Sequence, residues 1–308
     1  MSITVAIPTH RRAHYLRSAL ASVASQTRLP DEVIVCEDGS DSETLGVVDS
    51  YRSSLPIVHI RNDPPLGEMG NRFLGLTSGE SSRVAMLDDD DEWESVFLER
   101  ADDALERHPE CGFFSSDHFI VDQDGMILEL ATEQASRRFG RVGMRTGVYH
   151  DVLYRHLART SFSLNTSLFR RESLLQLPRP ARSWGTAPDL AMFLELGAMR
   201  IPVFYLAERL GRYRVHPGQV TTDRVMMPKS AAATLLRLGL REDLTAPERG
   251  LLASRYRATT VELAIGYAHA GQRGDAVRVL GTFGQLGWGI PSAKRLLALV
   301  ALLAGLKR

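Results

Sequence analysis

The sequence predicts an α/β fold in which a largely parallel sheet is covered by helices on both faces. Three observations predict it. Apolar strand patterns alternate with helical patterns over residues 1–107, one apolar run ends in four consecutive aspartates, and the glycine-rich phosphate motifs of the common nucleotide-binding folds are missing. In such folds ligands bind at the carboxyl ends of the strands, so the aspartates mark the first place to look for a site.

Four short apolar segments have the character of buried strands, and a helical pattern follows each of them. The predicted strands are Ile3–Ile7, Glu32–Cys36, Ile57–Ile60 and Val84–Leu87. The first helix has Leu16, Leu20 and Val23 on one face, and the others lie over about 44–52, 69–76 and 96–107. This alternation predicts that the four strands are parallel neighbours in one sheet.

The pattern changes after Cys111. We expect a strand over Gly112–Ser116, then a hairpin over Phe119–Leu130 that turns at Asp122–Gly125. Ala135–Gly147 is rich in arginine and glycine, which predicts a mobile loop. Its arginines fit a solvated basic loop and a phosphate-contacting lid about equally well.

Three further elements complete the predicted sheet region. Asn165–Arg171 resembles a short strand, and Val203–Leu206 a last one. Between them, Pro188 opens a helix that runs to Leu196, with Asp189 in its first turn.

Beyond Asp223 the sequence predicts helices alone, over Met227–Leu240, Pro247–Ala270 and Gly274–Leu286. We therefore expect a catalytic domain over residues 1–222 and a helical region over residues 223–308. The tail, Ser292–Arg308, holds an apolar run between basic residues that is too short to span a bilayer. It suits an anchor lying in the membrane surface, and equally a helix packed on its own domain or on a second subunit of an oligomer.

Composition narrows the choice of partners. The chain has 308 residues, zero formal net charge and a pI of about 7.1, which argues against a nucleic-acid partner. Its two cysteines, Cys36 and Cys111, form no metal-binding or CxxC pattern, which favours a reduced, cytoplasmic setting. The first residues enter a strand pattern directly, so we expect no secretory leader.

The aspartate run follows the last of the four parallel strands. Asp88, Asp89, Asp90 and Asp91 come directly after Leu87. Neighbouring carboxylates repel and raise each other's pKa, and a divalent cation such as Mg²⁺ or Mn²⁺ would remove that cost. The run therefore predicts a metal that holds a phosphorylated ligand, with a solvated acidic turn as the plain alternative.

Two nucleotide-binding folds can be set aside by motif. No GxGxxG follows the first strand, and no GxxxxGK[ST] occurs, which disfavours a dinucleotide fold and a P-loop nucleotidase. Phosphate must then be neutralised in another way, and an aspartate-held metal would do so.

Several short motifs occur in one order along the chain and together resemble family 2 glycosyltransferases with the GT-A fold. They are Ile7–Arg12, Gln26–Thr27, Glu37–Ser40, Leu87–Asp91 and Tyr213–Gly218. The resemblance covers roughly Ile3 to Val220. It implies a mixed sheet flanked by helices, to which the C-terminal helical region is added.

The resemblance also implies an activity. Such enzymes move a sugar from a nucleoside diphosphate sugar, here expected to be of the UDP type, to a hydroxyl of a glycan, a lipid-linked or another acceptor, usually with inversion. It implies a Mn²⁺ or Mg²⁺ cofactor, a role in polysaccharide biosynthesis, and a cytoplasmic enzyme at the inner face of the membrane.

Matched position by position, the motifs assign roles to single residues. Asp90 would ligate the metal directly, with His216 near the metal and the diphosphate. Asp189 matches the catalytic base. The remaining matched positions would contact the nucleotide sugar, with Asp38 on the base: Pro8, Thr9, Arg12, Asp38, Asp88 and Asp89.

The chemistry agrees with this assignment. A departing diphosphate builds negative charge that a divalent metal stabilises, while a carboxylate takes the proton of the acceptor hydroxyl. Taken alone, Asp189 is an ordinary residue for a helix N-terminus and Asp38 one for a turn, so only the joint arrangement points to function. Departures from the family pattern at Arg11, Glu37, Ser42 and Glu195 leave the donor base and sugar open.

Two other functions remain as alternatives. A sugar nucleotidyltransferase would want a glycine-rich basic loop after the first strand, and Thr9–Arg12 has two arginines but no glycine. A scaffold that binds nucleotide sugars without catalysis would not need Asp90 and Asp189.

Overall fold

The computed structural model describes residues 1–177, 188–216 and 224–281. The chain's contacts group into two units, residues 1–180 with 196–217 and residues 181–195 with 218–308. The domain boundary near residue 222 stays a prediction.

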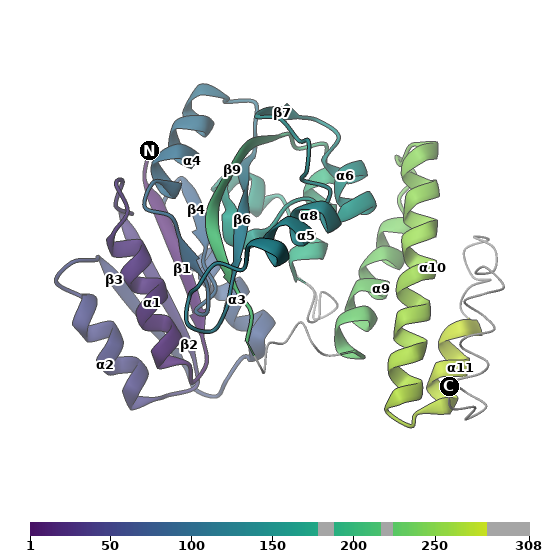
Figure 1. The fold of residues 1–308 in the computed structure, drawn as a ribbon, viewed down its shortest axis with the longest axis horizontal. Helices are drawn as coiled ribbons and strands as arrows, with labels where there is room; N and C mark the ends of the chain where they lie inside the picture. The colour runs from purple at the N-terminus through teal and green to yellow at the C-terminus, as the bar shows by residue number, and fades with distance from the viewer. Residues whose placement is uncertain (178–187, 217–223, 282–308) are drawn as a thin grey trace. The chain divides into compact units, whose positions relative to one another are not determined.

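A mixed sheet forms the centre of the first unit (Figure 1). β1 (Ile3–Thr9), β2 (Glu32–Asp38), β3 (Ile57–Asn62) and β4 (Arg83–Met86) are parallel, in the order β3-β2-β1-β4. This is the parallel sheet that the sequence predicts. The order continues through β8 (Ser167–Arg170), β6 (Phe113–Val121), β9 (Val203–Arg214) and β5 (Glu92–Trp93), with β7 (Gly147–Tyr149) paired to β9.

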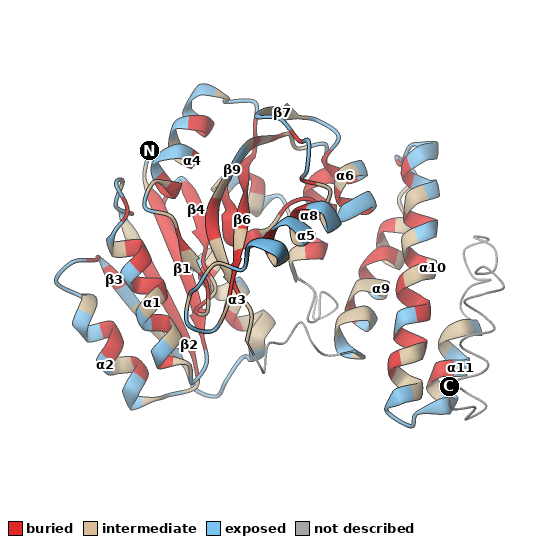
Figure 2. Cartoon of the chain, viewed as in Figure 1, coloured by how far each residue is buried: buried red, intermediate tan, exposed pale blue. Residues whose placement is uncertain are grey.

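Helices cover both faces of the parallel part. α1 (Ala13–Ala24), α2 (Ser42–Tyr51) and α4 (Phe97–Arg107) share one buried cluster with Ile3, Val5 and Ile7 of β1. α3 (Gly67–Ser78) packs on the opposite face, where a Cβ on Gly75 would lie 3.1 Å from the Cβ of Ala6. Figure 2 shows the result, with β1 and β4 buried along their length and β2 at all but its first residue, while β3 at the end of the sheet is buried only at Ile57.

The segment after β6 matches its prediction only in part. The predicted turn at Asp122–Gly125 is present, and the chain returns antiparallel to β6 through the bridge between Val121 and Ile127 and the hydrogen bond from the Leu128 amide to the Ile120 carbonyl at 2.8 Å. The returning segment is shorter than predicted, because α5 (Glu129–Arg138) begins directly after it and packs on β6, where the Thr132 hydroxyl accepts a hydrogen bond from the Ile120 amide. The loop predicted over Ala135–Gly147 is therefore helical at its start. Its Arg141 is buried rather than solvated.

α6 (Val152–Arg159), a 3-10 turn (Leu164–Thr166) and α7 (Arg171–Leu175) complete this part of the chain. α8 (Pro188–Ala198) confirms the helix predicted from Pro188. The predicted C-terminal helices are also confirmed, as α9 (Met226–Gly239), α10 (Ala246–His269) and α11 (Arg273–Gly281). The tail Ser292–Arg308 lies outside the described residues.

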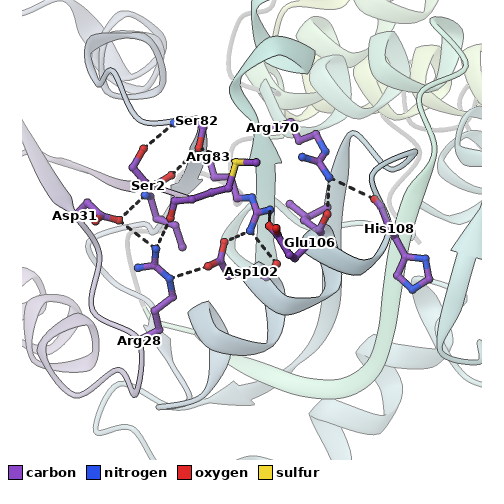
Figure 3. Close-up of polar contacts among 12 residues, drawn as sticks. Ser2, Arg28, Asp31, Ser82, Arg83, Asp102, Glu106, His108 and Arg170 are labelled. Atoms are coloured by element: carbon purple, nitrogen blue, oxygen red, sulfur yellow. Dashed lines mark hydrogen bonds and ion pairs between the residues drawn. The ribbon is translucent and has the colours of Figure 1, made fainter.

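At the amino edge of the sheet, where β1 and β4 begin, a network of ion pairs ties the strands to their helices (Figure 3). Arg83 is 1% exposed and pairs with Asp102, and with Glu106 at 2.8 Å. Arg28 also pairs with Asp102, at 2.8 Å, and with Asp31 at 3.2 Å. Burial lowers the pKa of Arg83, and these carboxylates offset that cost.

Candidate functional site

The carboxyl ends of β1, β2 and β4 meet at one edge of the sheet. β1 pairs with β2 on one side and with β4 on the other, both in parallel. The amide of Leu87 donates to the carbonyl of Ala6, which extends this pairing to the residue before the aspartates. Thr9, Asp38 and the aspartate run thereby share one edge, as ligand sites in open α/β sheets do.

Cationic side chains bind three of the four aspartates. Arg72 of α3 lies 2.6 Å from an oxygen of Asp88. Arg12 lies 3.3 Å from Asp89 and 2.8 Å from Asp90. A second contact to Asp90, at 3.1 Å, comes from Nε2 of His216.

Asp91 has a different setting, because neutral donors fix both of its oxygens. One accepts from the side-chain amide of Asn165 at 2.7 Å, and the other from the backbone amide of Arg214 at 2.9 Å. Asn165 is held in turn by the indole of Trp93, which donates to its carbonyl at 2.6 Å. Asp91 therefore links the aspartate turn to β9.

Charge at this edge is under-compensated. Burial first, and then the charge of Asp90, raise the pKa of Asp89 to about 7. Burial also raises the pKa of Asp88, where Arg72 opposes the rise, and raises that of Asp91 well above its ordinary value. Desolvation and like charge both disfavour the ionised carboxylates, and a bound cation would reverse that preference.

The donor set fits a divalent metal. Asp88, Asp90 and Asp91 can each present an oxygen within 4.8 Å of the others. Hard carboxylate oxygens are the ligands that Mg²⁺ and Mn²⁺ prefer. Because the oxygens of Asp91 already accept hydrogen bonds, Asp88 and Asp90 are the better candidates for metal ligands. A bound metal would displace Arg72 from Asp88 and Arg12 from Asp90. His216 offers a nitrogen beside Asp90.

At the end of β2, Asp38 organises the start of α3. Its two oxygens accept from the amides of Leu66 at 2.6 Å and Gly67 at 3.0 Å. Gly67 has φ +78°, a conformation that suits glycine. Asn71 then donates to the carbonyl of Cys36 at 2.8 Å and anchors α3 to β2.

Three other predicted residues lie at the same edge. The hydroxyl of Thr9 donates to Asp89 at 2.7 Å, and Pro8 sits in β1 opposite Cys36. Glu37 is buried and holds His59 at 2.9 Å and Arg61 at 3.3 Å. The structure therefore gathers Pro8, Thr9, Arg12, Asp38, Asp88, Asp89, Asp90 and His216 around one edge.

Asp189, the predicted base, is half-buried in the first turn of α8. It belongs to the second unit, whereas the aspartate cluster belongs to the first. Its role as base stays a prediction.

Sequence reasoning did not single out Arg72, Asn71 or Asn165. Arg72 and Asn71 lie in a helix, and Asn165 lies in a turn. None of them carries a local pattern that marks it, because each reaches the site only through the fold. Arg214 stood inside a recognised motif without an assigned role, and its backbone amide binds Asp91.

Comparison with solved structures shows that this is a GT-A fold. TarS from S. aureus, solved in complex with UDP, superposes with a TM-score of 0.69 at 19% identity, over 99% of this chain and 87% of that one. Mannosyltransferase PcManGT from Pyrobaculum calidifontis, solved with GDP-Man and Mn²⁺, gives a TM-score of 0.64 at 18% identity, over 98% and 84%. The mixed sheet with flanking helices thus places the chain among proteins with the GT-A fold.

Sequence comparison identifies the family. Residues 4–152 match the model of glycosyl transferase family 2. One relative is the UDP-Glc:α-D-GlcNAc-diphosphoundecaprenol β-1,3-glucosyltransferase WfaP of Escherichia coli, 24% identical over 45% of this chain. Another is the putative teichuronic acid biosynthesis glycosyltransferase TuaG of Bacillus subtilis, 23% identical over 72% of this chain. The chain is a family 2 glycosyltransferase, and it spans about half of the length of WfaP (54%) and 82% of TuaG.

Within the described residues, no helix combines the length and apolar character needed to cross a membrane.

Proposed function

We propose that this enzyme transfers a sugar, with inversion, from a nucleoside diphosphate sugar to a hydroxyl of a glycan or lipid-linked acceptor, in a reaction that depends on Mn²⁺ or Mg²⁺. One observation carries the proposal. At the carboxyl edge of the sheet the buried Asp89 and Asp91 and the half-buried Asp88 have raised pKa values, and two arginines, Arg12 and Arg72, are the counterions there. Such an edge is suited to a metal and a diphosphate.

The donor would bind along this edge. Asp38 and Thr9 would contact the nucleoside, and Arg12, which pairs with Asp90 at 2.8 Å, would lie near the diphosphate. We expect a UDP-type donor, because TarS was solved with UDP and with UDP-GlcNAc, although PcManGT was solved with GDP-Man. If Asp90 and Asp88 bound the metal, Arg12 would keep Asp89 and Arg72 would keep Glu68 as partners, and the guanidinium nitrogens released from Asp90 and Asp88 could donate to the phosphates.

The chemical step needs one proton acceptor. Asp189 would take the proton of the acceptor hydroxyl as its oxygen attacks the anomeric carbon from the face opposite the diphosphate. The new carbon–oxygen bond forms while the bond to the diphosphate breaks, which inverts the anomeric centre. A bound metal, held by Asp90 with Asp88 and His216, supplies stabilisation of the charge on the leaving diphosphate.

The names of relatives suggest the setting of the reaction. WfaP acts on a diphosphoundecaprenol-linked sugar, and TuaG is assigned to teichuronic acid. We propose a similar role in polysaccharide biosynthesis at the cytoplasmic face of the membrane, with residues 292–308 as an anchor in the membrane surface or as a contact in an oligomer.

The test is donor turnover. Release of nucleoside diphosphate is measured from a panel of nucleotide sugars with Mn²⁺, with Mg²⁺ and with chelator. Wild-type protein should turn over one donor only with metal, and Asp90→Ala should lose turnover by about 10³-fold or more, since metal stabilisation contributes several kcal/mol. Asp103→Ala, an exposed aspartate of α4, is the matched control. Metal-independent turnover, or an active Asp90→Ala, would overturn the metal assignment.

A further inference from the structure

A strongly basic segment lies outside the proposed site. Residues 135–160 hold six arginines and one aspartate, a net charge of +5 in a chain whose formal net charge is zero. The segment comprises the end of α5, the loop to β7, and α6. Nothing in the proposed transfer reaction uses it.

The fold gathers these arginines on one surface. Leu130, Arg137 and Arg138 are exposed and lie seven and eight positions apart, on one face of α5. Arg159, at the end of α6, joins them because its stem packs on Gly140, where a Cβ would lie 2.9 Å from the Arg159 Cβ. Gly140 has φ +67° as well, so both its space and its backbone suit glycine.

A buried arginine, Arg141, connects the elements that carry this surface. Arg141 donates to Asp117 at 2.8 Å and to the carbonyl of Ser161 at 2.9 Å. It thereby ties the end of α5 to the residues that follow α6. Its guanidinium also lies 5.1 Å from the centre of the Phe139 ring, which Arg138 approaches to 5.6 Å.

The outward arginines are not neutralised by the described part of the chain. Arg137, Arg138, Arg145 and Arg159 are exposed and form no ion pair with any described residue. Arg155 differs, since it pairs with Asp151 at 2.7 Å. Four cations therefore face solvent together.

Large apolar side chains are also exposed on α5, on α6 and on the loop that follows α5. Leu130 is 73% exposed, Val142 59% and Tyr154 44%. Exposed apolar groups add nothing to the binding of a soluble polyanion. A surface that combines exposed apolar side chains with arginines is the kind that inserts into the interface of an anionic bilayer.

We propose that this α5–α6 surface, formed by Leu130, Arg137, Arg138, Val142, Arg145, Tyr154 and Arg159, is a contact site for an anionic phospholipid bilayer. The site goes beyond the proposed transfer reaction and is separate from the tail at residues 292–308. Arginines bind the headgroup phosphates, while the three apolar side chains enter the boundary with the acyl chains. The contact would bring the catalytic unit to the leaflet that carries lipid-linked substrates.

The charge is tested by co-sedimentation of the full chain with vesicles of phosphatidylglycerol and phosphatidylcholine. Three surface arginines change partitioning onto an anionic membrane by about 10²-fold at moderate salt. Arg137→Gln/Arg138→Gln/Arg159→Gln should show that loss. The matched control, Arg17→Gln/Arg100→Gln/Arg107→Gln, removes the same charge from exposed positions of α1 and α4 and should bind like wild type. Equal losses in both triple variants, or no difference from wild type, would overturn the proposal.

A second variant separates a membrane from a soluble polyanion. Leu130→Ser/Val142→Ser should bind the anionic vesicles several-fold more weakly and should bind soluble polyphosphate as wild type does. If this variant keeps full vesicle binding while the arginine variant loses polyphosphate, the surface binds a polyanion and the membrane assignment is wrong. Metal-dependent donor turnover without acceptor should be unchanged in all these variants. The outcome of the vesicle-binding experiment is therefore independent of the proposed function.

Discussion

The two edges of the same sheet differ in how far arginines balance the charge of their carboxylates. At the amino edge, Arg28 and Arg83 share Asp31, Asp102 and Glu106, and Arg170 binds main-chain carbonyls (Figure 3). At the carboxyl edge, four consecutive aspartates, Asp88–Asp91, share two arginines and one histidine. With Arg170 close enough to act on Arg83 by charge, the first edge has three arginines near three carboxylates, whereas the second has two arginines near four.

This difference separates a structural network from a functional one. At the amino edge burial lowers the pKa of Arg83, and its carboxylates oppose the shift. At the carboxyl edge burial and like charge raise the pKa values of Asp88, Asp89 and Asp91 together. A cluster that gains from an added cation is a place where a metal and a phosphorylated ligand can bind.

The largest expected effect concerns the base. Asp189→Asn keeps the shape of the side chain and removes the proton acceptor, so turnover should fall by about 10²- to 10⁴-fold. Donor affinity should hardly change, because the variant leaves the proposed donor site at the carboxyl edge of the sheet intact. The measurement is turnover beside donor affinity by calorimetry. Near-normal turnover, or equal losses in both quantities, would assign Asp189 to structure or binding.

The amino edge should respond in stability and not in chemistry. Asp102→Asn leaves Arg83 buried with one partner fewer, and we expect a loss of about 2 to 3 kcal/mol in the free energy of unfolding. The neighbouring Asp103→Asn is exposed and should change it by less than about 0.5 kcal/mol. Urea unfolding at pH 7 measures both. Similar values for the two variants would mean that the amino-edge network contributes little.

A third buried cluster predicts a smaller, pH-dependent effect. Burial, and then the charge of Arg141, lower the pKa of His118 to about 3. Below pH 6.5 the unfolded chain takes up a proton at His118 that the folded chain does not, so stability falls as the pH drops. Between pH 7 and pH 5.5 this histidine should cost about 1 kcal/mol.

His118→Gln should remove that part of the pH dependence, measured by urea unfolding across the same range. His150→Gln, at an exposed position, controls for the loss of a histidine. A His118→Gln protein with the full wild-type slope would show that His118 takes no part in it.

The parallel half of the fold could be predicted from sequence because its signals are local. Ile3–Ile7 was expected as a strand and β1 runs from Ile3 to Thr9, since a buried parallel strand is a continuous apolar run. The hairpin after β6 was right in its turn and wrong in the length of its second strand, which ends at Leu128. Met126, Leu128 and Leu130 alternate like a strand, yet Met126 and Leu130 are 68% and 73% exposed, so the alternation did not indicate a buried face.

The site was predictable to the same degree. The aspartate run and its place after a strand pointed to the edge, because both features are contiguous in sequence. Arg12 and His216 stood in recognised motifs, but Arg72 and Asn165 were not predictable, since they reach the aspartates from α3 and from a turn before β8. Only the fold reveals that these side chains meet.

The most direct test of the central claim is the thermal stability of Asp90→Asn with and without metal. The account predicts that in chelator the variant unfolds at the same temperature as wild type or higher, because one charge leaves an under-compensated cluster while Arg12 keeps Asp89. Mn²⁺ at 100 times its Kd should stabilise wild type by about 2.7 kcal/mol and the variant far less. A variant that is less stable in chelator and gains as much from Mn²⁺ as wild type would contradict a cation site at this edge.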